Sequence, residues 1–120
     1  MDDQDISKIE KIIKDREEAN TYFNNINSDV YKAFLDMERS AFRKGELEKK
    51  NKELIALGIS IVINCESCME WHTKEALRSG ASDKDVIEAI EVAIEMGGGP
   101  ATVASRFAVK ALNYHKKSKK

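Results

Sequence analysis

Residues 54–63 read LIALGISIVI, an almost unbroken apolar run in a chain in which 34% of residues are charged. Taken alone, the β-branched part of this run could form a buried strand. The charged stretch that leads into it from Glu46 and the lack of any partner strand favour a helix instead. A helix that is apolar on all sides must be buried on all sides. In so small a protein, we expect part of its surface to face another subunit.

The segments before this run also have helical spacing. Isoleucines at positions 6, 9, 12 and 13 predict a first helix from about Asp5 to Asn20. Ser28 is a plausible N-cap for a second helix, which Gly45 ends. The buried positions expected in this second helix are Tyr31, Phe34, Leu35, Met37 and Phe42.

Downstream of the run, capping residues divide the chain into further helices. Asn64 can cap a helix over Cys65–Ser79, and Gly80 follows at the position that favours a left-handed turn. Residues 82–85 predict a capping-box start for the next helix, and residues 97–100, Gly-Gly-Gly-Pro, predict a break. The final helix should run from about Pro100 to Tyr114. The sequence thus predicts an all-α fold of about six helices.

Size and charge restrict the classes of function. The 120 residues suit a single domain over 1–120, and a net charge of −1 provides no general attraction for nucleic acid. The basic residues 116–120 are expected to form a frayed, solvated tail. The acidic start at residues 1–5 does not resemble a secretory signal, and the apolar run is shorter than the ~20 residues that cross a bilayer. We therefore expect a cytoplasmic protein with no nucleic-acid or membrane partner.

The chemistry is expected at Cys65, Cys68 and His72. Positions three and four apart share one face of a helix, so these three side chains should lie together. The helix N-terminus favours an anion and so lowers the pKa of the Cys65 thiol. His72 is in reach of Cys68 and can take its proton. In the cytosol, such a dithiol is more typical of redox chemistry than of a structural disulfide.

Other interpretations of the cysteines are weaker. Buried, inert cysteines are one such interpretation, but it leaves the alignment of Cys65, Cys68 and His72 on one helical face unexplained. A zinc site would need a fourth ligand, and His115, in the last helix, is the only other histidine. Attachment of a c-type haem requires histidine directly after the second cysteine, where Met69 stands. A thioredoxin fold needs alternating strands and helices. We expect no metal and no cofactor.

Glu53 is a further candidate, twelve residues before Cys65. If the chain turns back at Asn64, Glu53 lies ~16 Å along one arm of the hairpin and His72 ~12 Å along the other, so the two could meet. A carboxylate on the imidazole would fix its tautomer and raise its basicity. The alternative is a surface charge in line with the neighbouring lysines 49, 50 and 52.

The spacing Glu53-x11-Cys65-x2-Cys68-x3-His72 resembles the motif of the alkylhydroperoxidase D-like proteins of the carboxymuconolactone decarboxylase superfamily. The similarity continues through residues 80–82, the helix from Asp83, the triple-glycine break and the alanine-rich last helix, and covers about Glu46 to Asn113. The resemblance implies an all-α fold with a redox helical hairpin, and a homo-oligomer, often a trimer or hexamer.

The resemblance also implies roles for the four residues. Cys68 is then the nucleophile, Cys65 the resolving thiol and proton donor, and Glu53 with His72 the proton relay. The substrate would be a peroxide or a disulfide, and a dithiol or protein thiol would donate electrons. The helix-dipole argument instead favours Cys65 as the more acidic thiol.

One departure from the family weakens the expectation of peroxidase activity. Some members carry a histidine between the cysteines, where this chain has Glu66-Ser67. Glu66 and Glu70 should raise the pKa values of the thiols and slow attack at neutral pH.

Two other functions stay open. The first is decarboxylation of a muconolactone-type ring acid, although Arg43, Arg78 and Arg106 are scattered in the sequence. The second is a non-catalytic oligomeric module that senses redox state. The sequence does not name the electron donor.

Overall fold

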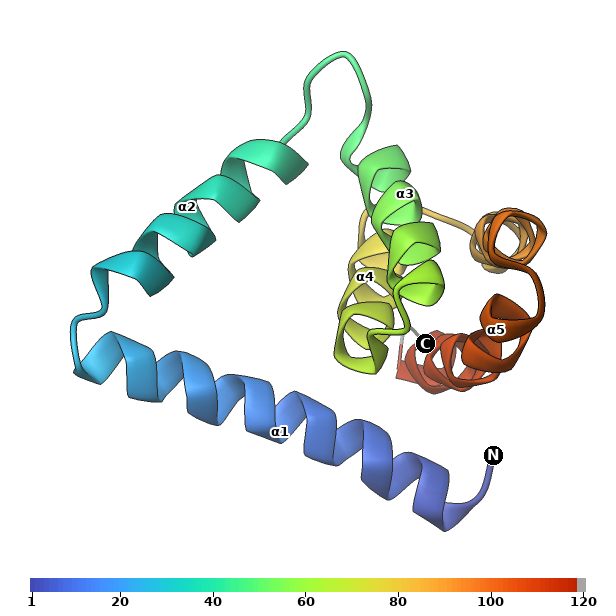
Figure 1. The fold of residues 1–120 in the computed structure, drawn as a ribbon, viewed down its shortest axis with the longest axis horizontal. Helices are drawn as coiled ribbons and strands as arrows, with labels where there is room; N and C mark the ends of the chain where they lie inside the picture. The colour runs from blue at the N-terminus through green and yellow to red at the C-terminus, as the bar shows by residue number, and fades with distance from the viewer. Residues whose placement is uncertain (119–120) are drawn as a thin grey trace.

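The computed structural model describes residues 1–118, in which all regular secondary structure is helical and no strand occurs. The predicted all-α class is confirmed. Figure 1 shows the five helices, which are α1 (Asp3–Asn25), α2 (Asp29–Phe42), α3 (Lys49–Val62), α4 (Glu66–Arg78) and α5 (Asp83–Ser118). We expected about six, and the difference lies in α5. Gly98 has the non-helical angles φ 66° and ψ −144°, so α5 is kinked at the predicted break into two helical segments that follow one another directly.

Helices α3, α4 and α5 pack against one another and supply most of the core. Helix α1 runs past this group and α2 leads back to the start of α3, so the two form the other sides of a triangle (Figure 1). Helix α1 contributes one buried side chain, Ile9, to the core. The other buried apolar side chains come from α3 to α5 and the turn before α5, among them Leu57, Ile61, Met69, Leu77, Ala81, Val86, Ile90, Phe107 and Leu112.

The predicted core positions of α2 are wrong, because this helix has no buried residue. Phe34 and Met37 are 52% and 62% exposed, while Tyr31, Leu35 and Phe42 are only partly buried. The cause is the position of α2, whose backbone has few contacts with α1 and α3 and, within residues 1–118, does not come close to the backbone of α4 or α5. It meets α4 through the ring of Phe42, at its end, which stacks on His72. Within residues 1–118, the apolar face of α2 is therefore not buried in the core.

The run at residues 54–63 forms a helix as expected, but it is not buried on all sides. Leu57 and Ile61 are fully buried, whereas Ile55 and Ile59 are 52% and 56% exposed. The helix begins at Lys49 rather than near Glu46. Its exposed apolar side continues onto the first half of α5, where Val92 and Met96 are also exposed, and this is where another subunit was expected.

Most capping signals of the sequence are confirmed. The Ser28 side chain caps α2, Ser82 and Asp85 form a reciprocal capping box, and Gly80 has φ 103°. At the turn between α3 and α4, the predicted N-cap was one residue too early. Cys65 is the N-cap of α4, and Asn64 adopts the left-handed conformation with φ 56° that reverses the chain.

Both chain ends are more helical than expected. Helix α1 begins at Asp3, behind a capping box made by Asp2 and Asp5, and it continues to Asn25. Helix α5 continues to Ser118 rather than ending near Tyr114, so the expected fraying from Lys116 is wrong as far as Ser118. Residues 119 and 120 of the predicted tail lie outside the described part of the chain. Within residues 1–118, no helix has the length and apolar character needed to cross a bilayer.

Candidate functional site

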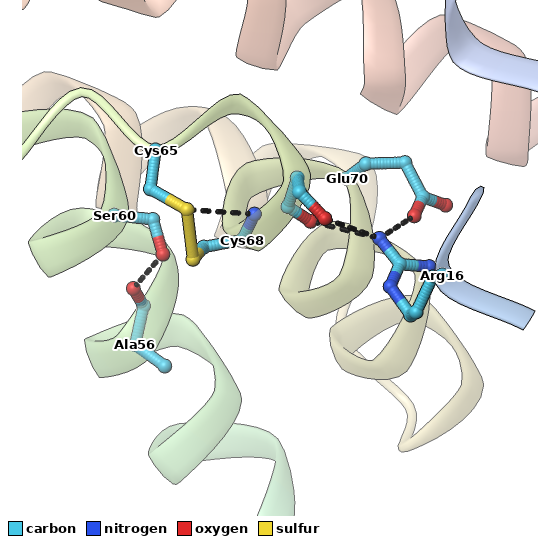
Figure 2. The surroundings of a disulfide bond; sticks show 7 residues. Arg16, Ala56, Ser60, Cys65, Cys68 and Glu70 are labelled. Atoms are coloured by element: carbon cyan, nitrogen blue, oxygen red, sulfur yellow. Dashed lines mark hydrogen bonds and ion pairs between the residues drawn. A yellow bond between two sulfur atoms is a disulfide. The ribbon is translucent and has the colours of Figure 1, made fainter. Parts of the chain in front are cut away.

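The two cysteines lie where α3 turns back into α4. The amide of Cys65 donates to the Ser60 carbonyl at 2.9 Å, which closes the turn after α3. Cys65 and Cys68 are joined by a disulfide (Figure 2). The amide of Cys68 also donates to Cys65 Sγ at 3.2 Å, as an N-cap side chain requires. The predicted juxtaposition of the two cysteines at the start of a helix is therefore confirmed.

The N-cap position distinguishes the two sulfurs. When the disulfide is reduced, a thiolate on Cys65 would accept the Cys68 amide and lie at the positive end of the α4 dipole. Cys68 is one turn further into the helix. The geometry thus supports the argument from the residues that Cys65 is the thiol whose anion α4 stabilises.

Glu53 and His72 meet across the hairpin, as predicted. His72 Nδ1 lies 2.7 Å from Glu53 Oε1, and the Lys49 ammonium lies 2.8 Å from Glu53 Oε2. The side chains of Glu53 and His72 are only 3% and 13% exposed. Burial opposes ionisation of Glu53, but the hydrogen bonds from His72 and Lys49 outweigh it and hold the pKa of this carboxyl below its usual value.

An ionised carboxylate can only accept hydrogen bonds, so His72 must donate through Nδ1. The Nε2 atom of the neutral ring is then left as the basic nitrogen. This is the arrangement in which a carboxylate fixes the tautomer of a general base. The pair therefore has the form of a proton relay.

Two neighbours of the relay were not recognised from the sequence. The ring of Phe42, expected in the core, stacks on the His72 ring with centroids 5.1 Å apart. Lys49, which we grouped with surface charges, is the second partner of Glu53. Its spacing of four residues from Glu53 was the available signal. Phe42, Arg43, Lys49 and Glu53 border an open surface cavity of about 680 Å³. Glu53 therefore lies at the wall of a cavity that opens to solvent, although its side chain is only 3% exposed.

The structure brings the four candidate residues together as two pairs within one hairpin. Cys65 is bonded to Cys68, and Glu53 is hydrogen-bonded to His72. His72 follows Cys68 by one turn of α4, but in the described part of the chain no hydrogen bond joins its ring to either sulfur of the disulfide.

The two acids expected to raise the thiol pKa values are neutralised by cations. Lys8 lies 3.0 Å from Glu66. Glu70 is fully buried and lies 2.6 Å from both Arg16 Nη2 and His115 Nε2. These partners oppose the effect that we expected Glu66 and Glu70 to have on the thiols. His115, the fourth ligand that a zinc site would have needed, is held by Glu70 instead.

The three arginines considered for a ring acid are not gathered into one site. Arg43 borders the cavity at the relay, and Arg106 borders a separate one beside α1. Arg78 pairs with Glu75 near the end of α4. A di-acid would therefore not find these cations together.

Comparison with known proteins agrees with the motif. The chain is 40% identical to Uncharacterized protein 4 in cox locus of Paracoccus denitrificans, over 68% of this chain and 73% of the relative. It is 38% identical to an uncharacterized protein of Cupriavidus necator, over 68% and 70%. It is also 26% identical to the Alkyl hydroperoxide reductase AhpD of Corynebacterium kroppenstedtii, over 61% of this chain but only 42% of that protein.

Solved structures extend the agreement to the fold. A carboxymuconolactone decarboxylase family protein from Legionella pneumophila superposes with a TM-score of 0.82 at 27% identity, covering 94% of this chain and 98% of that one. A Thermotoga maritima protein of the same family, described as a candidate for a role in antioxidative response, has a TM-score of 0.82 at 29% identity, covering 91% and 92%. Residues 28–111 match the Carboxymuconolactone decarboxylase family, and the chain belongs to this family.

Proposed function

We propose that this protein is a thiol-dependent redox enzyme that reduces a peroxide or a protein disulfide. The observation that carries the proposal is the placement of the bonded pair Cys65–Cys68 and the buried pair Glu53–His72 on one helical hairpin. A dithiol supplies two electrons, and a carboxylate-oriented histidine moves the protons. The similarity to an alkyl hydroperoxide reductase supports the same chemistry.

With a peroxide, the Cys68 thiolate attacks one peroxide oxygen and the O–O bond breaks. The leaving alkoxide takes a proton from the His72 side of the site, which gives an alcohol and a Cys68 sulfenic acid. The Cys65 thiolate then attacks the Cys68 sulfur, and hydroxide leaves as water after taking a proton. With a disulfide substrate, Cys68 instead forms a mixed disulfide, which Cys65 resolves. Both routes end at the Cys65–Cys68 disulfide.

Regeneration requires a dithiol or protein thiol donor. The donor thiolate attacks Cys68 Sγ, the Cys65–Cys68 bond breaks, and Cys65 leaves as a thiolate. A second donor thiol then releases Cys68, so the donor becomes a disulfide and the protein regains both thiols. Disulfide exchange is faster when the leaving thiol has the lower pKa. The N-cap position of Cys65 suits the role of leaving thiol. A lower pKa for Cys65 is therefore compatible with Cys68 as the residue that attacks the substrate.

The test is steady-state turnover with dithiol, lipoyl-protein and thioredoxin donors against both peroxide and disulfide acceptors. Wild-type protein should turn over with at least one combination. Cys68→Ser should abolish the reaction, whereas Cys65→Ser should permit attack without turnover and accumulate sulfenic acid or mixed disulfide. If the wild-type protein fails with every combination although its thiols are reduced, the proposed enzyme activity is wrong.

We also propose that the protein acts as a homo-oligomer, in keeping with the trimers or hexamers that the resemblance implies. The surface concerned lies between α3 and the first half of α5. It forms an open groove of about 780 Å³ bordered by Ile55, Ile59, Val62, Val92 and Met96. Each of these side chains is at least half exposed, and contiguous exposed apolar surface is typical of protein interfaces.

A further inference from the structure

A second buried charge network lies on the other side of α4, outside the proposed relay. Its centre is Glu70, whose side chain is 0% exposed. One carboxylate oxygen forms an ion pair with Arg16 Nη2 at 2.6 Å, and the other accepts from His115 Nε2 at 2.6 Å. The three residues come from α4, α1 and α5, and both Arg16 and His115 are separated from Glu70 by 45 residues or more in sequence.

The network reaches Ser67, one of the two residues between the cysteines. Arg16 Nη2 also donates to the Ser67 carbonyl at 2.9 Å and to Ser67 Oγ at 3.1 Å. Figure 2 shows Arg16 extending from α1 between Glu70 and the turn that carries the disulfide. The Arg16 guanidinium lies over the Trp71 ring, 5.1 Å from the ring centroid. The Arg16 side chain is 19% exposed. A partly desolvated cation is thus held against the first turn of the redox helix.

We propose that Arg16, Glu70 and His115 form a positioning network, which sets how strongly the first turn of α4 stabilises a thiolate on the cysteine pair. The inference rests on the proposed thiol chemistry and adds three residues to it. None of them touches a sulfur. Arg16 acts through the Ser67 backbone, Glu70 holds Arg16 in place while limiting its field, and His115 fixes Glu70.

The charges have separable effects. Arg16 favours an anion at the first turn of α4, whereas the Glu70 carboxylate opposes it. Burial alone would raise the pKa of Glu70, but its pairing with His115 and Arg16 holds that pKa below the usual value, so the carboxylate is ionised at neutral pH. Other charged or titratable groups around the hairpin also have partners: Lys8 pairs with Glu66, Lys49 with Glu53 and Glu75, and His72 with Glu53. Lys74 lies over the Trp71 ring.

Two substitutions should therefore change the thiols in opposite directions. Arg16→Gln leaves the Glu70 charge without its main counter-ion, so the pKa of the more acidic thiol should rise by about 0.5 to 1, with a three- to tenfold lower thiolate fraction below that pKa. Glu70→Gln leaves Arg16 without its carboxylate, so the same pKa should fall. A network that only stabilised the fold would lower the melting temperature in both variants and leave the thiol pKa unchanged.

Two further variants make the comparison specific. Lys8→Gln removes another ion pair between α1 and α4, the one to Glu66, without touching Ser67. Because that pair is about half exposed and solvent screens it, its loss should raise the thiol pKa less than Arg16→Gln does. The double variant Arg16→Gln with Glu70→Gln removes both charges, and its two amides can bond to each other. Its thiol pKa should return toward wild type. If Arg16→Gln alone does not fold, the comparison of Glu70→Gln with the double variant still isolates the effect of Arg16.

The experiment measures alkylation rates of the reduced full-length protein against pH, together with the equilibrium of the Cys65–Cys68 disulfide with glutathione. Arg16→Gln should also make the disulfide harder to reduce, because its reduced form is less stabilised. Equal thiol pKa values in the wild type, Glu70→Gln and the double variant would overturn the inference. So would shifts of one sign in both single variants. Failure of the proposed function would instead appear as wild-type thiols that never form the disulfide.

Discussion

Replacing Glu53 by glutamine tests the relay most specifically, because the change keeps the size of a buried side chain and removes its charge. Glu53 is 2% exposed and accepts from His72 Nδ1 at 2.7 Å. A hydrogen bond to an ionised group contributes about 1.5–3 kcal/mol. If that contribution is realised only as the imidazole takes up a proton, its loss should slow thiol turnover about 10- to 150-fold.

The relay also predicts how fast the His72 variant and the double variant should be. Removing the base itself with His72→Ala should cost about 10²–10⁴-fold, the usual range for general acid–base assistance. The double variant should be little slower than His72→Ala alone, since residues that act as a unit have non-additive effects. The helical circular-dichroism signal should be retained in all three proteins.

The assay is peroxide or disulfide turnover together with the pH dependence of Cys68 alkylation. Glu75→Gln is the matched control, because Glu75 also pairs with Lys49, at 3.5 Å, but among the described residues it forms no hydrogen bond or ion pair with His72. Turnover and thiol pKa in Glu53→Gln that match those of the Glu75 control would refute the relay. The hairpin would then carry a Cys–Cys–His arrangement in which Glu53 is only structural.

Three further outcomes follow from the structure. The folded-state pKa values of Glu53 and Glu70 lie below the ordinary value of 4.5, so the unfolded chain binds more protons in acid. Stability should therefore be complete above about pH 5 and fall at lower pH, and neutralising both residues should flatten that slope in urea titrations. Gly98→Ala should lower the free energy of unfolding by about 1–3 kcal/mol, because φ 66° with ψ −144° suits only glycine. Gly99→Ala is the control and should be nearly neutral, since no atom lies within 4 Å of the Cβ that it adds. Ile59→Glu places a charge in the exposed apolar groove, and sedimentation should show smaller species than the wild type; a wild-type protein that sediments as a 13.5 kDa monomer at micromolar concentration would contradict the assembly proposal.

The features that could be predicted from the sequence depend on local spacing. The turn at Asn64 and the helical rise on either side of it were enough to bring Glu53 to His72. The capping box at Ser82 and the left-handed Gly80 are equally local, because cap and turn chemistry involves residues only a few positions apart. For these elements, periodicity and caps agree with the final packing.

The features that could not be predicted depend on contacts between distant segments. Nothing in residues 28–42 indicates that the apolar face of α2 would lie beside the bundle instead of inside it, as the exposure of Phe34 shows. The pairing of Glu70 with Arg16 and His115 joins three helices across the chain, and no periodic pattern marks it. Glu70 was consequently interpreted only as an acid near the thiols that should raise their pKa values.

The most direct test of the central claim is the mass of one peptide through one redox cycle. Trypsin should release residues 53–74, with both cysteines in a single peptide bounded by Lys52 and Lys74. We expect this peptide to lose two hydrogen masses when the reduced, folded protein meets one equivalent of the acceptor it turns over. The lost mass should return when a dithiol is added, at a rate that supports turnover. A peptide whose thiols stay free in the presence of peroxide and of disulfide would contradict the account.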